Sequence, residues 1–537
     1  MKTLLLALTA LTTPALAQTY QPDQAALKAH VGFLASDELK GREAGTPEYD
    51  IAARYVASQF EAMGLKPAGD KGSYLQSVPL VTFRPATEGS MVLRRGGSDT
   101  PLQFGVDFLP SSNPVAAELA KEAEVVFVGF GISAPEFGRD DYAGLDVRGK
   151  IVAYLGGTPK NLPSEEGAHY GNTVTKRTLA AQKGAIGTIT VYTPTRQRVS
   201  PFERSARNWR SFGATWADKN GTAYYPGGAA PGLGTLSLSG AQTLFGAREW
   251  ARISKAAESK TGRVGHLNLP GTVRVAYTNE IVQRPSSNVV GLIEGSDPAL
   301  KNEYVVMTAH LDHVGVGVPV NGDAIYNGAM DNAVGTASLI EVAHGFKHLQ
   351  YRPKRSILFV AVTAEEKGLV GADYFAQNPT VPKAAMVANV NLDMPIITYD
   401  FRDVVAFGAE RSTIGDSVRR AGAPLGVTLV PDPEPEQGIF TRSDHYRFVQ
   451  QGIPSVFIVT GPGGDGARAS AAFEKDHYHQ PSDEANDSIR YDVGAKFVSL
   501  NMNIVRELAD APDRPRWKQG DFFGRLYNGY GAVDRAR

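Results

Sequence analysis

Short runs of apolar and β-branched residues recur along the second half of the chain, at residues 304–308, 357–362, 386–390 and 455–460. The first three are too short for helices and too hydrophobic for strands that face water, so we predict buried parallel strands, and the fourth is also strand-like. Apolar residues at helical spacing over 333–346 predict a helix between the first two runs. This alternation predicts an α/β fold whose mixed, largely parallel sheet is flanked by helices.

Acidic residues or histidines follow each predicted strand or stand in the turn before the helix. The carboxyl ends of strands form the ligand crevice of an open α/β sheet, so we expect these side chains to converge. In chain order they are His310, Asp312, Asp331, Glu365, Glu366, Asp393 and His479.

Carboxylate oxygen and imidazole nitrogen are ligands for divalent metals, and a pair of metal ions needs about five protein ligands, one of them bridging. The stretch 304–394 offers four, and the histidine-rich turn at 476–483 offers a fifth. For any one of these residues, a solvated strand end is an equally good interpretation. Solvation does not explain why all of them stand at strand ends, so the sequence predicts a metal site.

Five motifs occur in the order AHLDH, MDNAVG, AEEKG, NLDM and YHQPSD. They resemble the metal-site motifs of the M28 family of zinc aminopeptidases, the aminopeptidase Y type, with a phosphorylase/hydrolase-like fold. The resemblance implies two Zn²⁺ ions per chain, with Asp331 bridging them, and no ligand position departs from the family pattern. The implied ligands are His310, Asp331, Glu366, Asp393 and His479.

The same resemblance implies roles for three further residues. Glu365 matches the general base, and Asp312 matches a carboxylate that orients His310. Tyr478 matches a tyrosine that hydrogen-bonds the developing oxyanion, although an aromatic side chain packed in the cleft is an open alternative.

These expectations predict a two-zinc exopeptidase, an aminopeptidase that removes N-terminal residues from peptide substrates. The carboxylates of Asp331, Glu365, Glu366 and Asp393 exceed what two Zn²⁺ ions and a hydroxide neutralise, which suits a substrate ammonium group. A carboxypeptidase or dipeptidase of the same family is the alternative, because Arg442, Arg447 or Lys367 offers a partner for a substrate carboxylate. A single-zinc glutaminyl cyclase and a non-catalytic receptor-like protein do not require the complete set of residues.

Composition narrows the classes of partner. The formal net charge of −1 gives no electrostatic footprint for nucleic acid or an anionic membrane. The absence of cysteine excludes disulfides and thiolate ligands. The oligomeric state and the preferred substrate side chain stay open.

The N-terminal segment 1–17 has one lysine, an apolar run and Ala-Leu-Ala before Gln18, which is typical of a cleavable secretory signal. The apolar run is too short to span a bilayer, and no later segment is long and apolar enough to do so. We therefore expect an exported protein, periplasmic or secreted, without a membrane anchor after signal cleavage.

The length of 537 residues predicts two or three domains. Residues 116–283 have a different sequence pattern, with short strand-like runs between turns rich in glycine and proline, which predicts a second domain. The pieces VVFVGFGI, DDYAGLDVRGKIVAYL and KRTLAAQKGAIGTITVY resemble an inserted, β-rich protease-associated (PA) domain. The predicted peptidase domain then comprises 18–115 and 284–511, and 512–537 is a tail.

Three further segments carry open alternatives. Arg42 and Glu43 reach the active-site mouth or form a loop salt bridge, the second being favoured. The arginine-rich stretch 196–225 is a loop over the active site or, more often for such a composition, a solvated surface. Asp444 and His445 line the substrate pocket or form an internal hydrogen-bonded turn, so neither is assigned to catalysis.

Overall fold

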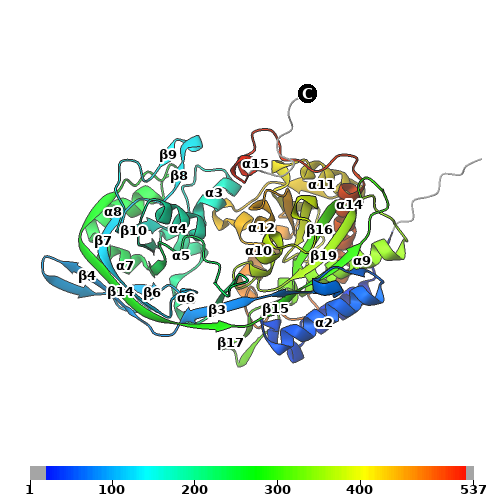
Figure 1. Ribbon diagram of the computed structural model, residues 1–537, viewed down its shortest axis with the longest axis horizontal. Helices are drawn as coiled ribbons and strands as arrows, with labels where there is room; N and C mark the ends of the chain where they lie inside the picture. Colours follow the sequence, from blue (N-terminus) through cyan, green and yellow to red (C-terminus); the bar gives the residue numbers. More distant parts are fainter. Residues whose placement is uncertain (1–19, 528–537) are drawn as a thin grey trace, which may run out of the picture.

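The computed structural model describes residues 20–527, and the predicted signal segment lies outside them. Figure 1 shows two units side by side, each built around its own sheet. Among the described residues, no helix has the length and apolar character needed to cross a membrane.

The unit that contains the predicted metal site, called the peptidase unit after that prediction, has four parallel strands at the centre of its sheet, in the order β19, β16, β20, β23. These strands are β16 (Tyr304–His310), β19 (Ser356–Val362), β20 (Met386–Leu392) and β23 (Ser455–Thr460), and every residue of β19 and β20 is buried. The predicted α/β class and its mixed sheet are confirmed. Antiparallel neighbours β15 and β21 flank the centre, and the remaining strands lie outside them. The outer strands are β1 (Lys66–Pro67), β2 (Leu75–Val78), β15 (Ser286–Ile293), β21 (Asp403–Phe407) and β22 (Thr428–Val430).

Helices bury both faces of this sheet, as continuous apolar strands require. One face packs against four helices whose apolar side chains share a core with Val305, Met307 and Ala309 of β16. The opposite face packs Val306 against two shorter helices. The first four are α1 (Gln24–Leu34), α2 (Pro47–Ala62), α9 (Val334–His348) and α14 (Tyr491–Asp510), and the shorter two are α10 (Val370–Gln377) and α12 (His445–Val449). The peptidase unit also contains α11 (Ile414–Gly422), α13 (Gly466–Asp476) and the hairpin β17 (Gly315–Val320) and β18 (Asp323–Tyr326).

The second unit is built on a ten-stranded sheet around the long strand β14 (Leu267–Gln283). Its other strands are β3 (Leu80–Pro85), β4 (Ser90–Arg95), β5 (Ser98–Pro101), β6 (Phe108–Pro110), β7 (Glu118–Phe127), β10 (Ile151–Leu155), β11 (Gly187–Val191), β12 (Gly213–Trp216) and β13 (Gly232–Leu236). A two-stranded ribbon, β8 (Ser133–Ala134) with β9 (Arg139–Asp140), stands apart from this sheet. Helices α3 (Ser164–Gly171), α4 (Thr173–Gln182), α5 (Pro194–Val199), α6 (Phe202–Arg207), α7 (Leu238–Phe245) and α8 (Ala247–Ala257) complete this unit.

This second sheet begins earlier in the chain than the predicted boundary at residue 116. Strands β3 and β4 both pair with β14, which lies well over a hundred residues later in the chain. A long strand exposes unpaired backbone groups along both edges, and these early strands supply the missing partners. The pairing is set by a distant segment, so local periodicity does not reveal it.

Polar contacts and ring contacts join the two units. Arg411 of the peptidase unit pairs with Glu165 and Glu166 of α3, and His169 Nδ1 lies 2.8 Å from the hydroxyl of Tyr446. The described part of the tail packs on the peptidase unit and includes the short helix α15 (Phe522–Leu526). Trp517, 1% exposed, anchors it by donating from Nε1 to the carbonyl of Gly452 at 2.8 Å.

Candidate metal centre

The seven residues predicted at strand ends are brought to one edge of the peptidase sheet. His310 is the last residue of β16, Asp393 follows β20 directly, and Glu365 and Glu366 follow β19. Asp331 stands in the turn before α9. The three strands are adjacent and parallel, so their carboxyl ends meet.

A first cluster contains His310, Asp331 and Asp393, all buried. His310 Nε2 lies 3.1 Å from Asp393 Oδ1 and 3.3 Å from Asp331 Oδ1. Three ligand atoms this close together can hold one metal ion.

A second cluster forms around the other oxygen of Asp331. His479 Nε2 lies 3.2 Å from Asp331 Oδ2 and 3.0 Å from Glu366 Oε2. Asp331 therefore presents one oxygen to each cluster, which is the arrangement that a bridging carboxylate requires.

His313 is a site residue that the sequence reasoning did not assign. Its Nδ1 lies 2.7 Å from Glu366 Oε1 and 3.9 Å from Asp331 Oδ2, and the residue is fully buried. Neither ring nitrogen of His313 nor Glu366 Oε1 makes a hydrogen bond within the described part of the chain, despite the short distance. Buried polar groups are normally hydrogen-bonded, so this cluster fits a cation that its lone pairs would face. His313 is the second histidine of the AHLDH motif, and this was the feature of the sequence that could have identified it as a site residue.

The carboxylate of Asp312 is placed differently from the prediction that it orients His310. Its two oxygens accept hydrogen bonds from the backbone amides of Glu365, at 3.0 Å, and Glu366, at 3.3 Å. It is the backbone carbonyl of Asp312 that lies 3.0 Å from His310 Nδ1. The carboxylate thus holds the loop of both glutamates, because the unpaired amides there need an acceptor.

Two buried residues hold the remaining loops of the centre. Asp483 accepts from the amides of Met330, at 2.8 Å, and Asp331, at 3.0 Å. Arg42, 1% exposed, donates to the carbonyls of Leu311, at 2.9 Å, and Gly328, at 3.0 Å. Arg42 forms no salt bridge with another described residue, so the interpretation as a loop salt bridge was wrong for it.

The neighbour of Arg42 behaves as expected. Glu43 forms the loop salt bridge that was favoured, with Lys367 Nζ at 3.1 Å. Lys367 follows the two glutamates in sequence, so this ion pair ties the same loop to the N-terminal segment.

The electrostatics of the centre are those of an acidic site that favours cations. Burial opposes protonation of His310, but the carboxylates of Asp393 and Glu365 outweigh it and raise the pKa of His310 well above its usual value. For Glu366, the positive charges of His479 and His313 outweigh burial and hold its pKa well below its usual value. Burial raises the pKa of Glu365 well above its usual value.

Glu365 and Tyr478 stand beside the clusters. The carboxylate of Glu365 makes no hydrogen bond or ion pair with another described residue, while its amide is held by Asp312. The ring of Tyr478 stacks on His479 with centroids 4.0 Å apart, and its hydroxyl accepts from Arg442 Nη2 at 3.3 Å. Tyr478 is therefore a packed aromatic whose hydroxyl also has a cationic neighbour.

Asp444 and His445 are fully buried, and none of their side-chain oxygen or ring nitrogen atoms has a hydrogen-bond partner among residues 20–527. Burial raises the pKa of Asp444 to about 8 and lowers that of His445 to about 3. The hydrogen-bonded turn suggested as one alternative does not involve these side chains.

Comparison with known proteins identifies the part of the chain that carries this centre. Residues 288–505 match the model of peptidase family M28. A probable zinc metalloprotease of Pyrenophora teres f. teres is 33% identical over 153 residues, which cover 28% of this chain and 31% of that protein. Aminopeptidase Y of Saccharomyces cerevisiae is 25% identical over 254 residues, 46% of this chain and 43% of that protein.

A third relative, leupeptin-inactivating enzyme 1 of Streptomyces exfoliatus, is 27% identical over 260 residues, 48% of this chain and 53% of the relative. The matched segments thus span about a third to a half of the length of these relatives. An aminopeptidase from Aneurinibacillus sp. strain AM-1 shares the fold of both units, with a TM-score of 0.53 and 19% identity over 92% of this chain and 96% of that one. The centre described above lies within the matched segment, and residues 288–505 of this chain form a peptidase domain of family M28.

Proposed function

We propose that this protein is a zinc-dependent aminopeptidase with two Zn²⁺ ions in one site. The observation that carries the proposal is the position of Asp331, whose two oxygens face two separate clusters of ligand atoms. The relatives named as zinc metalloprotease and aminopeptidase support the choice of metal and reaction.

The proposed ligands are His310 and Asp393 for one ion, Glu366 and His479 for the other, and Asp331 for both. Zn²⁺ ions held by these residues would polarise a peptide carbonyl and lower the pKa of a bound water. His313 is a further imidazole beside the second cluster, and its unpaired ring nitrogens support a cation there.

Glu365 is the proposed general base. Its carboxylate has no described partner, whereas the adjacent Glu366 faces the metal cluster. Consecutive residues of an extended or turning segment point in different directions, which separates the two roles. Glu365 accepts the proton of the attacking water and returns it to the leaving amine. The hydroxyl of Tyr478 is the proposed donor to the oxyanion that develops on the carbonyl.

The acidic surplus supports an aminopeptidase over a carboxypeptidase. Asp331, Glu365, Glu366 and Asp393 lie together in one buried centre, and a substrate ammonium group is the complementary charge. An Arg442 side chain without a carboxylate partner among the described residues supports the second candidate, a carboxypeptidase or dipeptidase.

The test compares three substrates of one sequence, for example a leucyl tripeptide that is free, N-acetylated or C-amidated. We expect acetylation to abolish cleavage. Equal cleavage of the acetylated and free peptides would refute the aminopeptidase. Tolerance of acetylation together with loss on amidation would establish the carboxypeptidase.

We also propose that the protein is exported, on the basis of the signal-like segment at residues 1–17. Expression of the full chain followed by fractionation and N-terminal sequencing tests this. A mature N-terminus at Gln18 outside the cytoplasm is expected, and an intact N-terminus in the cytoplasm would contradict it.

A further inference from the structure

A cavity of about 1310 Å³ lies between the two units. Its walls come from α4, α5 and β11 of the second unit and, in the peptidase unit, from residues 435–438, Thr441, Arg442 and Arg447. It is larger than the roughly 300–1,000 Å³ of typical small-molecule pockets, so several residues of a peptide fit inside.

The charge of this cavity is opposite to that of the metal centre. Seven lysine and arginine residues line it, against three acidic residues. One of the acids, Glu258, is already paired with Lys160 and Arg198. A second, Asp373, accepts hydrogen bonds from Trp216 Nε1 at 2.7 Å and Gln377 Nε2 at 2.9 Å. Five of the basic residues then have no ion-pair partner within the described chain.

The contacts of these five residues leave their charge uncompensated. Arg177 donates to the carbonyl of Pro226, and Arg447 to the carbonyl of Gly368 and the side chain of Gln450. The ammonium of Lys176, 1% exposed, donates to the carbonyls of Leu155, at 2.8 Å, and Gly157, at 2.5 Å.

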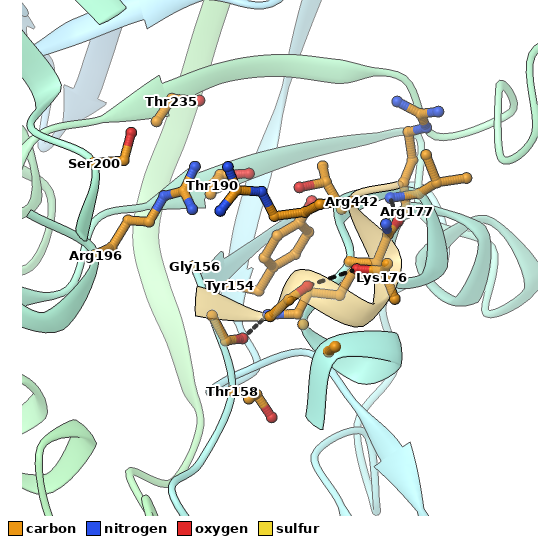
Figure 2. Close-up of a pocket in the computed structure, with 18 of the residues that line it drawn as sticks. Tyr154, Gly156, Thr158, Lys176, Arg177, Thr190, Arg196, Ser200, Thr235 and Arg442 are labelled. Atoms are coloured by element: carbon orange, nitrogen blue, oxygen red, sulfur yellow. Dashed lines mark hydrogen bonds between the residues drawn. The ribbon is translucent and has the colours of Figure 1, made fainter. Parts of the chain in front are cut away.

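Arg196 and Arg442 are the two of these five with the most exposed side chains, and they lie on opposite sides of the cavity. Figure 2 shows their guanidinium groups pointing toward one another, with Tyr154 and Lys176 nearby. Arg196 comes from α5 of the second unit, and its side chain makes no hydrogen bond or ion pair with another described residue. Two guanidinium groups facing each other repel unless an anion lies between them.

Arg442 links the wall of the cavity to the metal centre through side-chain contacts. The same side chain that lines the cavity donates to the hydroxyl of Tyr478, and Tyr478 stacks on His479. Gly368 also lines the cavity. Its amide donates to the carbonyl of Glu365 at 2.9 Å and so closes the turn that carries Glu365 and Glu366. A peptide whose first residue lies at the metal centre would send its following residues past these two positions.

We propose that this cavity binds a carboxylate of the peptide substrate, on the part of the chain that leaves after cleavage. This rests on the proposed function and deepens it: the substrate is a short peptide whose ammonium end meets the acidic centre and whose carboxylate meets Arg196, Arg442 and Lys176. The carboxylate belongs either to the C-terminus or to an acidic side chain. Both are carboxylates, and guanidinium groups bind carboxylates through bidentate hydrogen bonds.

Burial of Lys176 supports the same conclusion. It lowers the pKa of this ammonium to about 7, and a carboxylate in the cavity would stabilise the charged form.

The test uses Arg196→Gln and its matched control Arg248→Gln, in the metal-loaded full-length protein. Arg248 is an exposed arginine of α8 in the same unit, outside the lining of the cavity. Each protein is assayed on leucyl p-nitroanilide, which has no carboxylate, and on leucyl di-, tri- and tetrapeptides. The peptides carry a free or amidated C-terminus and either glutamate or glutamine as their last residue.

For the wild-type protein, we expect kcat/KM on at least one carboxylate-bearing peptide to be about 10-fold or more higher than on its uncharged counterpart. The difference should arise mainly from a lower KM for the charged peptide. Arg196→Gln should remove most of this preference and leave kcat/KM on the anilide unchanged. Arg248→Gln should change neither the preference nor the kcat/KM on the anilide. A preference for free acids over amides identifies the C-terminus, and a preference for glutamate over glutamine identifies the side chain.

Equal rates for charged and uncharged peptides in the wild-type protein would overturn the proposal, as would a preference that survives in Arg196→Gln. Binding of the tripeptide acid and its amide to the zinc-loaded Glu365→Gln variant, measured by calorimetry, separates this outcome from failure of the proposed function. A carboxylate-dependent affinity that Arg196→Gln removes supports the cavity even if the anilide is not cleaved. Equal affinity for acid and amide refutes it.

Discussion

The metal centre and the interdomain cavity are neighbours with opposite charge and opposite construction. The centre is acidic, almost fully buried, and made by one unit at the ends of adjacent parallel strands. The cavity is basic, open to water at Arg196 and Arg442, and made by two units that meet. In the centre, carboxylates and histidines lie within about hydrogen-bond distance of each other. In the cavity, four of the five unpaired cations contact carbonyl oxygens, a side-chain amide, a hydroxyl group or aromatic rings. The fifth, Arg196, makes no side-chain hydrogen bond or ion pair with another described residue.

This difference separates two tasks. Reaction at a peptide bond needs groups fixed within a fraction of an ångström, which a sheet edge provides through amide contacts such as those of Asp312 and Asp483. Selection by charge needs only a complementary field over several ångströms, which flexible arginines provide. The first task is sensitive to small displacements, and the second depends on how the two units dock.

The largest effect is expected from removing the shared carboxylate of the centre. Asp331→Ala takes one ligand atom from each cluster, so both proposed zinc ions should lose affinity together. Zinc per purified chain, measured by atomic absorption, should fall below two, with activity reduced to background. Two zinc ions per chain with normal kinetics would contradict the bridging role.

Glu365→Gln should separate chemistry from metal binding within the same centre. The amide keeps the size of the side chain but cannot accept the proton, so kcat should fall by about 100- to 10,000-fold. Zinc content should stay at the wild-type value. If zinc is lost instead, or activity stays near normal, the roles of Glu365 and Glu366 must be exchanged.

The docking of the two units is tested by Arg411→Met. Arg411 is 19% exposed and pairs with Glu165, 15% exposed, and Glu166, 7% exposed. Removing the cation leaves two largely buried carboxylates unpaired, which should lower the free energy of unfolding by about 3–5 kcal/mol. Urea denaturation measures the loss.

The same variant sharpens the contrast between centre and cavity. Cleavage of carboxylate-bearing peptides should decrease more than cleavage of the anilide, because the cavity depends on docking and the centre does not. Adding Glu165→Gln and Glu166→Gln to Arg411→Met should recover much of the stability. A stability unchanged from wild type in Arg411→Met would show that the ion pairs contribute nothing to docking.

A smaller effect is expected from His169 at the same junction. Burial lowers its pKa to about 4, against an ordinary value of 6.5. Between these two pH values the unfolded state binds more protons than the folded state, so stability decreases as pH falls through this window. The full shift corresponds to about 3 kcal/mol.

The measurement compares the free energy of unfolding of wild type and His169→Gln at pH 7 and pH 4.5. The variant should lose less stability on acidification than wild type does. His348→Gln, at an exposed histidine, is the control variant. An identical pH dependence in His169→Gln and wild type would mean that His169 does not contribute.

The sequence alone was sufficient for the central strands and for most of the candidate site. Buried parallel strands produce continuous apolar runs, and their carboxyl ends share one edge, so local pattern and topology together place His310, Glu366 and Asp393 near each other. The helix predicted at 333–346 is α9, Val334–His348, for the same reason. The motif resemblance identified the family that residues 288–505 match.

Tertiary structure decided what depends on contacts between distant segments. Strands β3 and β4 belong to the second sheet because β14 pairs with them, and no local pattern records that partner. Which atom of Asp312 meets His310, and which loops Arg42 and Asp483 hold, follow from unpaired backbone groups that only the folded chain brings together. Arg196 and Arg442 are 246 positions apart in the numbering, and their common cavity exists only because the two units dock.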